Sequence, residues 1–505
     1  MKIQKRSTIG LIELPLSRLI DPEGRNWYGL ARHEYALVSK PILIPNLRAQ
    51  GFDVQFIDLR KGDYIGDFGK VKWGDTEFTK SYFGAKIEDL DPLAYDAWGV
   101  TSNFMQNREI ACMAIKHLAS KGRPVVVGGS DAIAVYPTYL AAGATAVVMD
   151  KSGAANGAIM DYALGFPPRT PLSGVVLREG KQPPIRVRKQ MHPEDWPLPE
   201  ISDARECMGR RLNALPIPQE LDPAGAIFPD IGCNQKCDFC QTPQYHLAYR
   251  AMTPEKILKW FEILKQAGAG SVGSHSDQFL GRVLYKNGRE EIMECLNGVR
   301  DLGIPFSLAN GLDVQKLTKG HGLKRTDGDL APDEELISAV CGWDGKVGCY
   351  QVYIPAERPL HGQEKYKKLI PWQAHCEVIK TIVGAGAPRF TYGVIIGFQD
   401  DNEETLLHLE EALSELYEDV LTINPSAKFY INPFVILPIP GTPLASDLMK
   451  SGLVRIHDPI FASFDLPTVD TRYLTYKDIA KWQIRLTKIG TPRDSAFYQL
   501  RNDYI

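Results

Sequence analysis

The sequence predicts an α/β protein with two strand–helix domains, a linker between them and a small, mostly helical cap. Apolar strands alternate with amphipathic helices over residues 1–165 and again over residues 226–445, the pattern of parallel sheets covered by helices. Residues 166–225 are rich in proline and charge, which predicts a linker with one hairpin;. Residues 446–505 form the expected cap, and most of its aromatics are expected to serve packing: Tyr473, Tyr476, Trp482 and Tyr498.

The first domain has the element order of a doubly wound, Rossmann-like fold. Strands are expected at residues 9–14, 52–59, 97–103, 124–130 and 144–149, and helices at 33–50, 108–121 and 136–142. Ligands of such sheets lie at the carboxyl ends of the strands. The residues at those ends are therefore candidates for cofactor binding: Thr101, Ser102, Asn103, Gly128 and Gly129. Paired glycines allow a ligand to approach the backbone closely, with a plain tight turn as the alternative.

The second domain repeats a strand and a helix with no sign that the strand direction reverses, which predicts a partial (β/α)6 barrel of the TIM type. Strands are expected at residues 226–228, 271–274, 305–310, 348–357, 390–398 and 428–437. Helices are expected at residues 254–267, 290–302, 332–340, 372–386 and 403–418. The active site of such a barrel lies at the carboxyl ends of its strands. Polar residues at those ends are Asp277, Asn310, Glu357 and Asp400.

Three of the nine cysteines follow the first strand of this barrel, in the spacing C-x3-C-x2-C: Cys233, Cys237 and Cys240. Thiolates gather in this way when they share a metal centre. A structural zinc site needs four ligands, and the next cysteine, Cys295, is far along the chain. Three ligands suit a cubane iron–sulfur cluster that keeps one iron open. Three buried cysteines that are close by chance are the alternative.

Composition narrows the class of protein further. A formal net charge of −3 gives no positive electrostatic field that would attract nucleic acid or an anionic membrane;. No apolar run approaches ~20 residues, so no membrane-spanning segment is expected. The odd number of cysteines and the absence of a signal-peptide pattern at the N-terminus favour a reducing compartment, the cytoplasm;.

The cysteine spacing, with the aromatic Phe239 before the third cysteine, resembles the radical S-adenosylmethionine (SAM) superfamily. Further segments resemble its cobalamin-binding branch: Val127-Gly128-Gly129-Ser130 in the first domain, then Ile354-Pro355-Ala356-Glu357-Arg358, Gly393-Val394-Ile395-Ile396-Gly397 and Pro440-Gly441-Thr442-Pro443-Leu444. The resemblance covers about residues 8–445. Within the branch, the tryptophan 2-C-methyltransferases of thiopeptide biosynthesis are similar at Cys240-Gln241-Thr242-Pro243-Gln244-Tyr245, Ser276-Asp277-Gln278-Phe279-Leu280, Gly342-Trp343-Asp344-Gly345 and Tyr353-Ile354-Pro355-Ala356-Glu357-Arg358-Pro359.

The chain also departs from the family pattern. It has no Asp-x-His-x-x-Gly motif in the first domain, so no protein histidine is expected on cobalt. The usual Gly-Glu-Gly-Glu after the last strand of that domain is replaced by Met149-Asp150-Lys151-Ser152-Gly153. The Gly-x-Glu-Ser ending of the fourth barrel strand retains only Glu357. A divergent subgroup is expected.

The resemblance implies three cofactors: a [4Fe-4S] cluster on Cys233, Cys237 and Cys240, SAM near the open iron, and cobalamin on the first domain. Phe239, Asn310 and Glu357 are expected to help bind them. For Glu357, a salt bridge to Arg358 or a neighbour is the alternative.

Two mechanisms are consistent with the family. In most members SAM closes the open iron and is cleaved to a 5′-deoxyadenosyl radical. In the tryptophan enzymes the methyl group is thought to move by polar displacement, with a carboxylate covering the iron and an arginine beneath cobalt. Asp277 and Arg60 are the candidates for those two roles, and Tyr353 for accepting or orienting a proton near the indole. The alternatives are a loop hydrogen bond for Asp277 and a solvated surface cation for Arg60.

The leading hypothesis is therefore a cobalamin-dependent methyltransferase that moves a methyl group from SAM to an unactivated carbon, with C2 of the tryptophan indole as the acceptor implied by the subfamily. The alternative is a radical enzyme that methylates an sp3 carbon or forms a ring on another natural-product precursor. A cofactor-binding sensor without turnover is the third hypothesis. The expected partners are a small-molecule substrate such as L-tryptophan and an electron donor such as flavodoxin or ferredoxin, and a monomer is expected.

Overall fold

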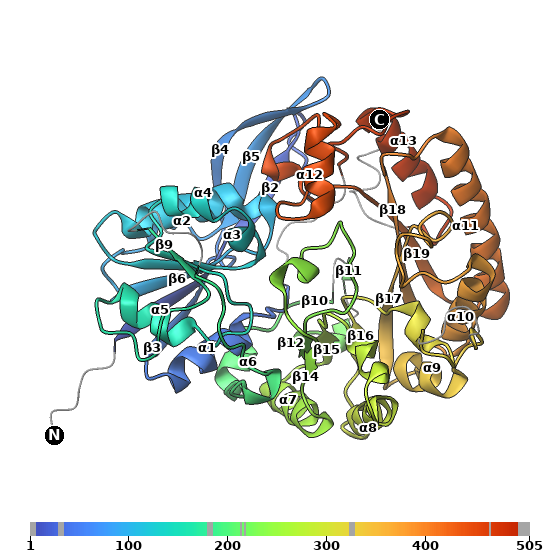
Figure 1. Cartoon of the computed structure of the whole chain (residues 1–505), viewed down its shortest axis with the longest axis horizontal. Coiled ribbons are helices and arrows are strands. Elements are labelled where there is room, and N and C mark those ends of the chain that lie inside the picture. The colour runs from blue at the N-terminus through green and yellow to red at the C-terminus, as the bar shows by residue number, and fades with distance from the viewer. Residues whose placement is uncertain are drawn as a thin grey trace.

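The computed structural model describes residues 7–28, 35–178, 185–212, 215–216, 219–322, 329–463 and 466–492. Two α/β domains lie side by side, and the C-terminal segment returns to lie near the first domain (Figure 1). None of the helices among these residues is long and apolar enough to cross a membrane.

The first domain is built on a six-stranded sheet in the order β3-β1-β6-β7-β8-β9. Its parallel strands are β1 (Thr8–Glu13), β3 (Asp53–Asp58), β6 (Ala97–Thr101), β7 (Val125–Gly128) and β8 (Ala146–Val148). Its helices are α1 (Lys40–Ala49), α2 (Arg108–Ala119), α3 (Ser130–Ala134), α4 (Tyr136–Ala141) and α5 (Asn156–Ala163).

Both faces of this sheet are buried, as a doubly wound fold requires. Ile9 and Leu11 of β1 pack with residues of α1 and α5, whereas Ile12 of the same strand packs with residues of α2 and α4. Alternate residues of a strand point to opposite faces, so one strand contributes to two cores. The predicted Rossmann-like fold is confirmed.

Three features of this region differ from the sequence prediction. The helix expected at 33–50 begins at Lys40, although residues 29–34 lie outside the described part of the chain. A second sheet, in the order β2-β5-β4, was not predicted; it is antiparallel and consists of β2 (Leu16–Ile20), β4 (Tyr64–Trp73) and β5 (Thr76–Gly84). Strand β9 (Val175–Leu177) comes from the predicted linker and pairs antiparallel with β8. The signal for the second sheet was the Gly74-Asp75 pair, a typical two-residue hairpin turn;.

The second domain contains six parallel strands in chain order, from β12 to β19. They are β12 (Ala224–Ile227), β15 (Ser271–Ser274), β16 (Phe306–Leu308), β17 (Cys349–Glu357), β18 (Arg389–Ile396) and β19 (Lys428–Val435). The helices between them are α7 (Pro254–Ala267), α8 (Gly288–Asp301), α9 (Glu334–Cys341), α10 (Trp372–Gly384) and α11 (Glu403–Ile423). Strands β12 and β19 form the two edges of the sheet, so the predicted partial barrel is confirmed.

The linker and the cap connect the two domains. The linker contains the expected hairpin, β10 (Arg211–Leu212) with β11 (Leu215–Pro216), and a short helix α6 (Ile201–Glu206). The C-terminal segment contains α12 (Pro443–Lys450) and α13 (Tyr476–Thr487), and Tyr498 lies outside the described residues.

Contacts from the second sheet to the cap fix the domains against each other. The indole nitrogen of Trp73 donates to the Pro467 carbonyl at 2.8 Å, and the Trp73 ring meets Tyr476 edge-on at 5.4 Å. Lys80 forms an ion pair with Asp458 at 3.0 Å. Figure 1 shows the second sheet on the side of the first domain that faces the orange C-terminal segment. Residues that are far apart in sequence thus connect the first domain to the C-terminal cap.

Candidate functional site

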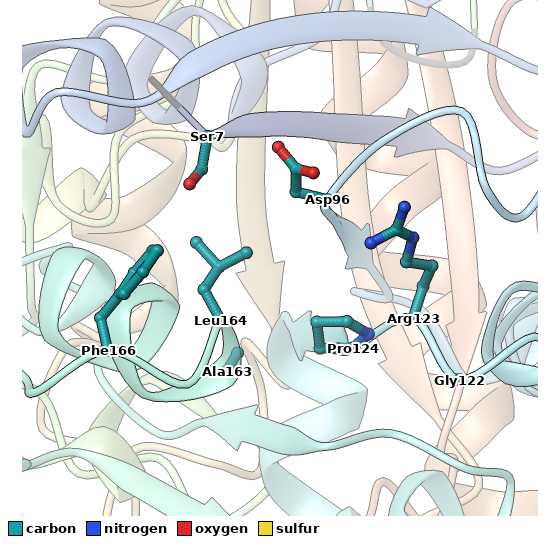
Figure 2. A pocket seen from close by; sticks show the side chains of 8 residues that line it. All are labelled: Ser7, Asp96, Gly122, Arg123, Pro124, Ala163, Leu164 and Phe166. Atoms are coloured by element: carbon teal, nitrogen blue, oxygen red, sulfur yellow. The ribbon is translucent and has the colours of Figure 1, made fainter. Parts of the chain in front are cut away.

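An open pocket of about 310 Å³ lies at the amino-terminal edge of the first sheet. Figure 2 shows Asp96 and Arg123 on one side of it and Leu164 and Phe166 on the other. Asp96 and Arg123 precede β6 and β7, so this pocket is at the edge opposite to Thr101 and Gly128. Ligands of doubly wound folds bind at the carboxyl edge, so this pocket is at the wrong edge for the expected site.

The cysteine loop begins at the carboxyl end of β12. A short antiparallel pair, β13 (Asp230–Ile231) with β14 (Arg250–Ala251), closes its base. Gly232 adopts φ +82°, and a Cβ at this position would lie 2.6 Å from the Ala248 carbonyl oxygen. The turn into Cys233 therefore requires glycine.

The three cysteines of the loop are free thiols that influence one another electrostatically. Burial raises the pKa of Cys233 to about 11 and that of Cys237 to about 12. The Gln235 N–H donates to the Cys233 sulfur at 3.4 Å. A structural zinc site needs four ligands, whereas three thiolates suit three corners of a cubane, so the donor set of this loop fits a cluster better than zinc;.

The loop after β17 packs against the cysteine loop. Tyr366 meets Phe239 edge-on at 5.2 Å and donates its hydroxyl hydrogen to Asp238 at 2.9 Å. Lys365 forms an ion pair with Asp238 at 2.6 Å. The predicted residue Phe239 thus anchors this second loop over the cysteines.

Glu357 ends β17 in the left-handed region, with φ +58°. Its carboxylate pairs with Lys368, not with Arg358, which binds Asp400 and Asp401 instead. Burial opposes the charge of Lys368, but Glu357 and Cys237 outweigh burial and raise its pKa. The ammonium also acts on the thiols of Cys233 and Cys240. Burial raises the pKa of all three thiols, and the positive charge of Lys368 acts against this by favouring their ionised form;.

Asp277 lies directly against the cysteine loop. One of its oxygens accepts a hydrogen bond from the Gly232 N–H at 2.8 Å. Its other oxygen has no hydrogen-bond partner among the residues with described positions. Burial raises the pKa of Asp277. The neighbouring Asp230 accepts bonds from the Ser276 hydroxyl and the Gln278 N–H, and thereby fixes the segment that carries Asp277.

Tyr353 lies in the middle of β17, and Asn310 follows the neighbouring strand β16. The Tyr353 ring meets Phe434 of β19 edge-on at 6.2 Å, and a Cβ at Gly393 would be 2.8 Å from its hydroxyl. The ring therefore crosses the interior face of the sheet, and burial raises its pKa. Asn310 is exposed and hydrogen-bonds His275, whose pKa burial lowers to about 4. Asp313, three residues further along, has one buried carboxylate oxygen without a hydrogen-bond partner among the described residues.

In the first domain, the predicted residues at the carboxyl edge mostly bond to their own domain. The Thr101 hydroxyl accepts from the buried Lys40 at 2.9 Å, and Ser102 is 2.8 Å from the Tyr139 hydroxyl. The Asn103 side chain accepts from the Ser130 N–H at 3.2 Å. These bonds, with those from the Ser102 N–H to the Gly128 carbonyl and from the Ile133 N–H to the Gly129 carbonyl, shape the turn that contains the two glycines.

Arg60 is buried, so the solvated-cation alternative is wrong. Its guanidinium donates to both oxygens of Asp58 at 2.9 and 2.8 Å and to the Tyr35 carbonyl at 2.6 Å. It lies just beyond β3 at the carboxyl edge of the first sheet. Two protein partners therefore fix the guanidinium in place at this edge.

The structure adds residues that the sequence did not single out as site residues. Lys151 follows β8 in the first domain, yet its ammonium lies 5.0 Å from the ring centre of Tyr245 in the cysteine loop. Lys368 and Asp313 join the cysteines from loops after other strands. The replacement of the family's Gly-Glu-Gly-Glu by residues 149–153 was a sequence signal that could have pointed to Lys151. No sequence signal pointed to Lys368, because only the fold brings it to the cysteines.

Known proteins resemble this chain over part of its sequence and over most of its fold. No family model matches the chain. A tRNA-2-methylthio-N(6)-dimethylallyladenosine synthase of Thermus thermophilus is 26% identical over 245 residues, which is 46% of this chain and 44% of the relative. The chain thus spans less than half the length of the curated relative that it matches.

Two solved structures share the fold over most of the chain. The cobalamin-dependent SAM radical enzyme OxsB, with aqua-cobalamin and SAM bound, aligns with a TM-score of 0.66 and 14% identity over 95% of this chain and 66% of OxsB. The radical SAM methyltransferase TsrM from Kitasatospora setae, with cobalamin and a [4Fe-4S] cluster bound, aligns with a TM-score of 0.53 and 13% identity over 90% of this chain and 79% of TsrM. Another TsrM structure holds tryptophan and a SAM analogue. At these identities the likeness shows that the chain has the two-domain fold of cobalamin-dependent radical SAM enzymes.

Proposed function

We propose that this chain is a cobalamin-dependent radical SAM enzyme that methylates carbon. The observation that carries the proposal is the placement of three free cysteines after the first strand of the partial barrel, next to the carboxyl edge of a Rossmann-like domain. The fold likeness to OxsB and TsrM spans both domains, and both proteins bind cobalamin.

In this proposal Cys233, Cys237 and Cys240 hold the [4Fe-4S] cluster, and SAM binds beside it near Glu357 and Asn310. Cobalamin binds over the edge formed by Thr101, Ser102 and Asn103 and the glycine pair after β7. When bound, these groups supply the electron transfer and the methyl group, while the protein orients them and excludes water. Lys368 holds Glu357 in place and offsets the negative charge of the thiolates.

Two residues would decide which mechanism operates. Asp277 is the candidate side chain for the open iron because it touches the cysteine loop and keeps one oxygen free of hydrogen bonds to described residues. Arg60 is the candidate for the lower face of cobalt, and Asp58 and the Tyr35 carbonyl would hold it there. The absence of an Asp-x-His-x-x-Gly motif is consistent with a cobalt that has no histidine ligand.

The acceptor that we propose is the indole of L-tryptophan, with Tyr353 near the reacting carbon. The motif resemblance and the tryptophan-bound TsrM structure support it. The second candidate is radical chemistry on another natural-product precursor. It is favoured by the higher TM-score against OxsB, 0.66 compared with 0.53.

One experiment separates these functions. The protein is reconstituted anaerobically with iron, sulfide and cobalamin, then supplied with a reductant, SAM and L-tryptophan. The expected products are S-adenosylhomocysteine and 2-methyltryptophan, and the Cys233→Ala/Cys237→Ala/Cys240→Ala variant is the inactive control. Stoichiometric 5′-deoxyadenosine without methylated indole would favour the second candidate. No consumption of SAM would exclude both.

A further inference from the structure

Lys151 is held by an unusually well-fixed loop at the end of β8. The Asp150 carboxylate accepts bonds from the Ser152 N–H at 2.8 Å, the Ser152 hydroxyl at 2.6 Å and the Ala155 N–H at 3.0 Å. The Ser152 carbonyl in turn accepts from the Trp196 indole at 2.8 Å. Asp150 therefore bonds only within its own loop, and the backbone on either side of Lys151 is rigid.

The Lys151 side chain leaves this loop toward the other domain. Its ammonium donates to the Ser130 hydroxyl at 2.9 Å and lies 5.0 Å from the ring centre of Tyr245. Ser130 directly follows the glycine pair of the first domain, and Tyr245 belongs to the cysteine loop of the second. The ammonium is thus between the two regions that we assign to cobalamin and to the cluster.

The Lys151 ammonium has no counter-ion in contact among the residues that the structure describes. Within the described residues no carboxylate lies within 4.0 Å of it, and Asp277 acts on it only from a greater distance. An ammonium has three N–H donors, and the contacts to Ser130 and the Tyr245 ring use only part of that capacity. Burial lowers the pKa of Lys151, which reflects the cost of an enclosed charge without a partner. An anionic ligand would remove this cost.

We propose that Lys151 binds the carboxylate of a small-molecule ligand that enters between the two domains, and that it selects for acids over the corresponding amines. A carboxylate suits the position better than a phosphate, because Asp277 would repel a doubly charged anion more strongly. The carboxylate belongs either to the methionyl group of SAM or to an amino-acid acceptor. This inference rests on the proposed function.

The test compares acids with their decarboxylated counterparts on the cofactor-loaded enzyme. Dissociation constants are measured for SAM and decarboxylated SAM, and for L-tryptophan and tryptamine. Lys151→Met is expected to weaken the acid of one pair at least tenfold and to leave its amine unchanged. Lys151→Arg keeps the charge and should retain most of the selectivity. The exposed Lys70→Met is the matched control, with a side chain that is 68% accessible.

The pair that responds identifies the source of the carboxylate. Cobalamin and cluster absorbance of each variant shows that it is folded and loaded. Unchanged binding of all four compounds by Lys151→Met would overturn the inference, as would equal losses for acid and amine, while the proposed function would stand. A wild-type protein that takes up neither cofactor would refute the proposed function and this inference with it.

Discussion

Replacing Gly129 by alanine is expected to destabilise the carboxyl edge of the first sheet by about 2–6 kcal/mol. Gly129 has φ +114° and ψ 168°, a backbone conformation that is essentially restricted to glycine;. A Cβ there would lie 2.2 Å from the Ser102 carbonyl oxygen, which is backbone and cannot rotate away. Strain of about 1–3 kcal/mol adds to a clash of similar size that must move the turn between β7 and α3 away from Ser102.

Gly128→Ala is the matched control on the adjacent residue. A Cβ at Gly128 would meet only the Val148 Cβ at 3.8 Å, an ordinary contact, so the stability should change by less than about 0.5 kcal/mol;. Hydrogen exchange of the β6 and β7 amides measures both local opening free energies. Equal protection in the two variants would refute the steric argument.

The same pair of variants tests ligand approach. If cobalamin lies against this backbone, Gly128→Ala should weaken its binding roughly tenfold, about 1.4 kcal/mol, while the sheet stays intact. Both variants should bind iron and sulfide like the wild type, because the cysteines are on the other domain. Wild-type cobalamin affinity in Gly128→Ala would show that the glycine pair serves the fold alone.

Three further predictions follow from the second domain. The triple alanine variant at the cysteines should lose iron and sulfide but still bind cobalamin, as metal analysis and absorbance will show; retained iron would contradict the assignment. Lys368→Met should destabilise the second domain by about 3–5 kcal/mol because Glu357 is left buried and unpaired, and the double variant with Glu357→Gln should recover much of the loss in urea unfolding; an equal loss in both would contradict the pairing. Burial opposes ionisation of Asp333, but Arg289, the Leu336 N–H and His321 outweigh burial and lower its pKa to about 2. Its stabilising effect should therefore be complete above pH ~4 and be lost as the pH falls toward 2, and Asp333→Asn should remove this part of the acid sensitivity; an unchanged acid dependence would contradict it.

The sequence alone could predict the fold class and the cysteine centre because both depend on local patterns. Short apolar strands that alternate with amphipathic helices indicated the two parallel sheets. Cys233, Cys237 and Cys240 lie close together in the sequence, so their spacing could be read directly. In the antiparallel sheet, the Gly74-Asp75 turn was a local signal for the β4–β5 hairpin. The pairing of β2 with β5 had no such signal, because the two strands are about sixty residues apart.

The surroundings of the cysteines could not be predicted, because they depend on where other loops end in space. The sequence identified Glu357 as a carboxylate at a strand end, but only the structure showed that Lys368 holds it. It named Arg60 as a candidate for the site with a solvated surface cation as the alternative, and only the structure showed that Arg60 is buried against Asp58. Burial converts such side chains from solvated charges into fixed ones, and burial is a property of the whole fold.

The sequence by itself determined that two parallel α/β domains are present and that one carries three thiolates after its first strand. Only the tertiary structure decided that a lysine from the first domain meets the cysteine loop of the second. Lys151 and Tyr245 are 94 residues apart in sequence, and their contact depends on how the linker and the cap orient the two domains. Electrostatic interactions depend on distance in space and not on separation along the chain. The position of the Lys151 ammonium at the centre of the proposed site could therefore be recognised only in the folded protein.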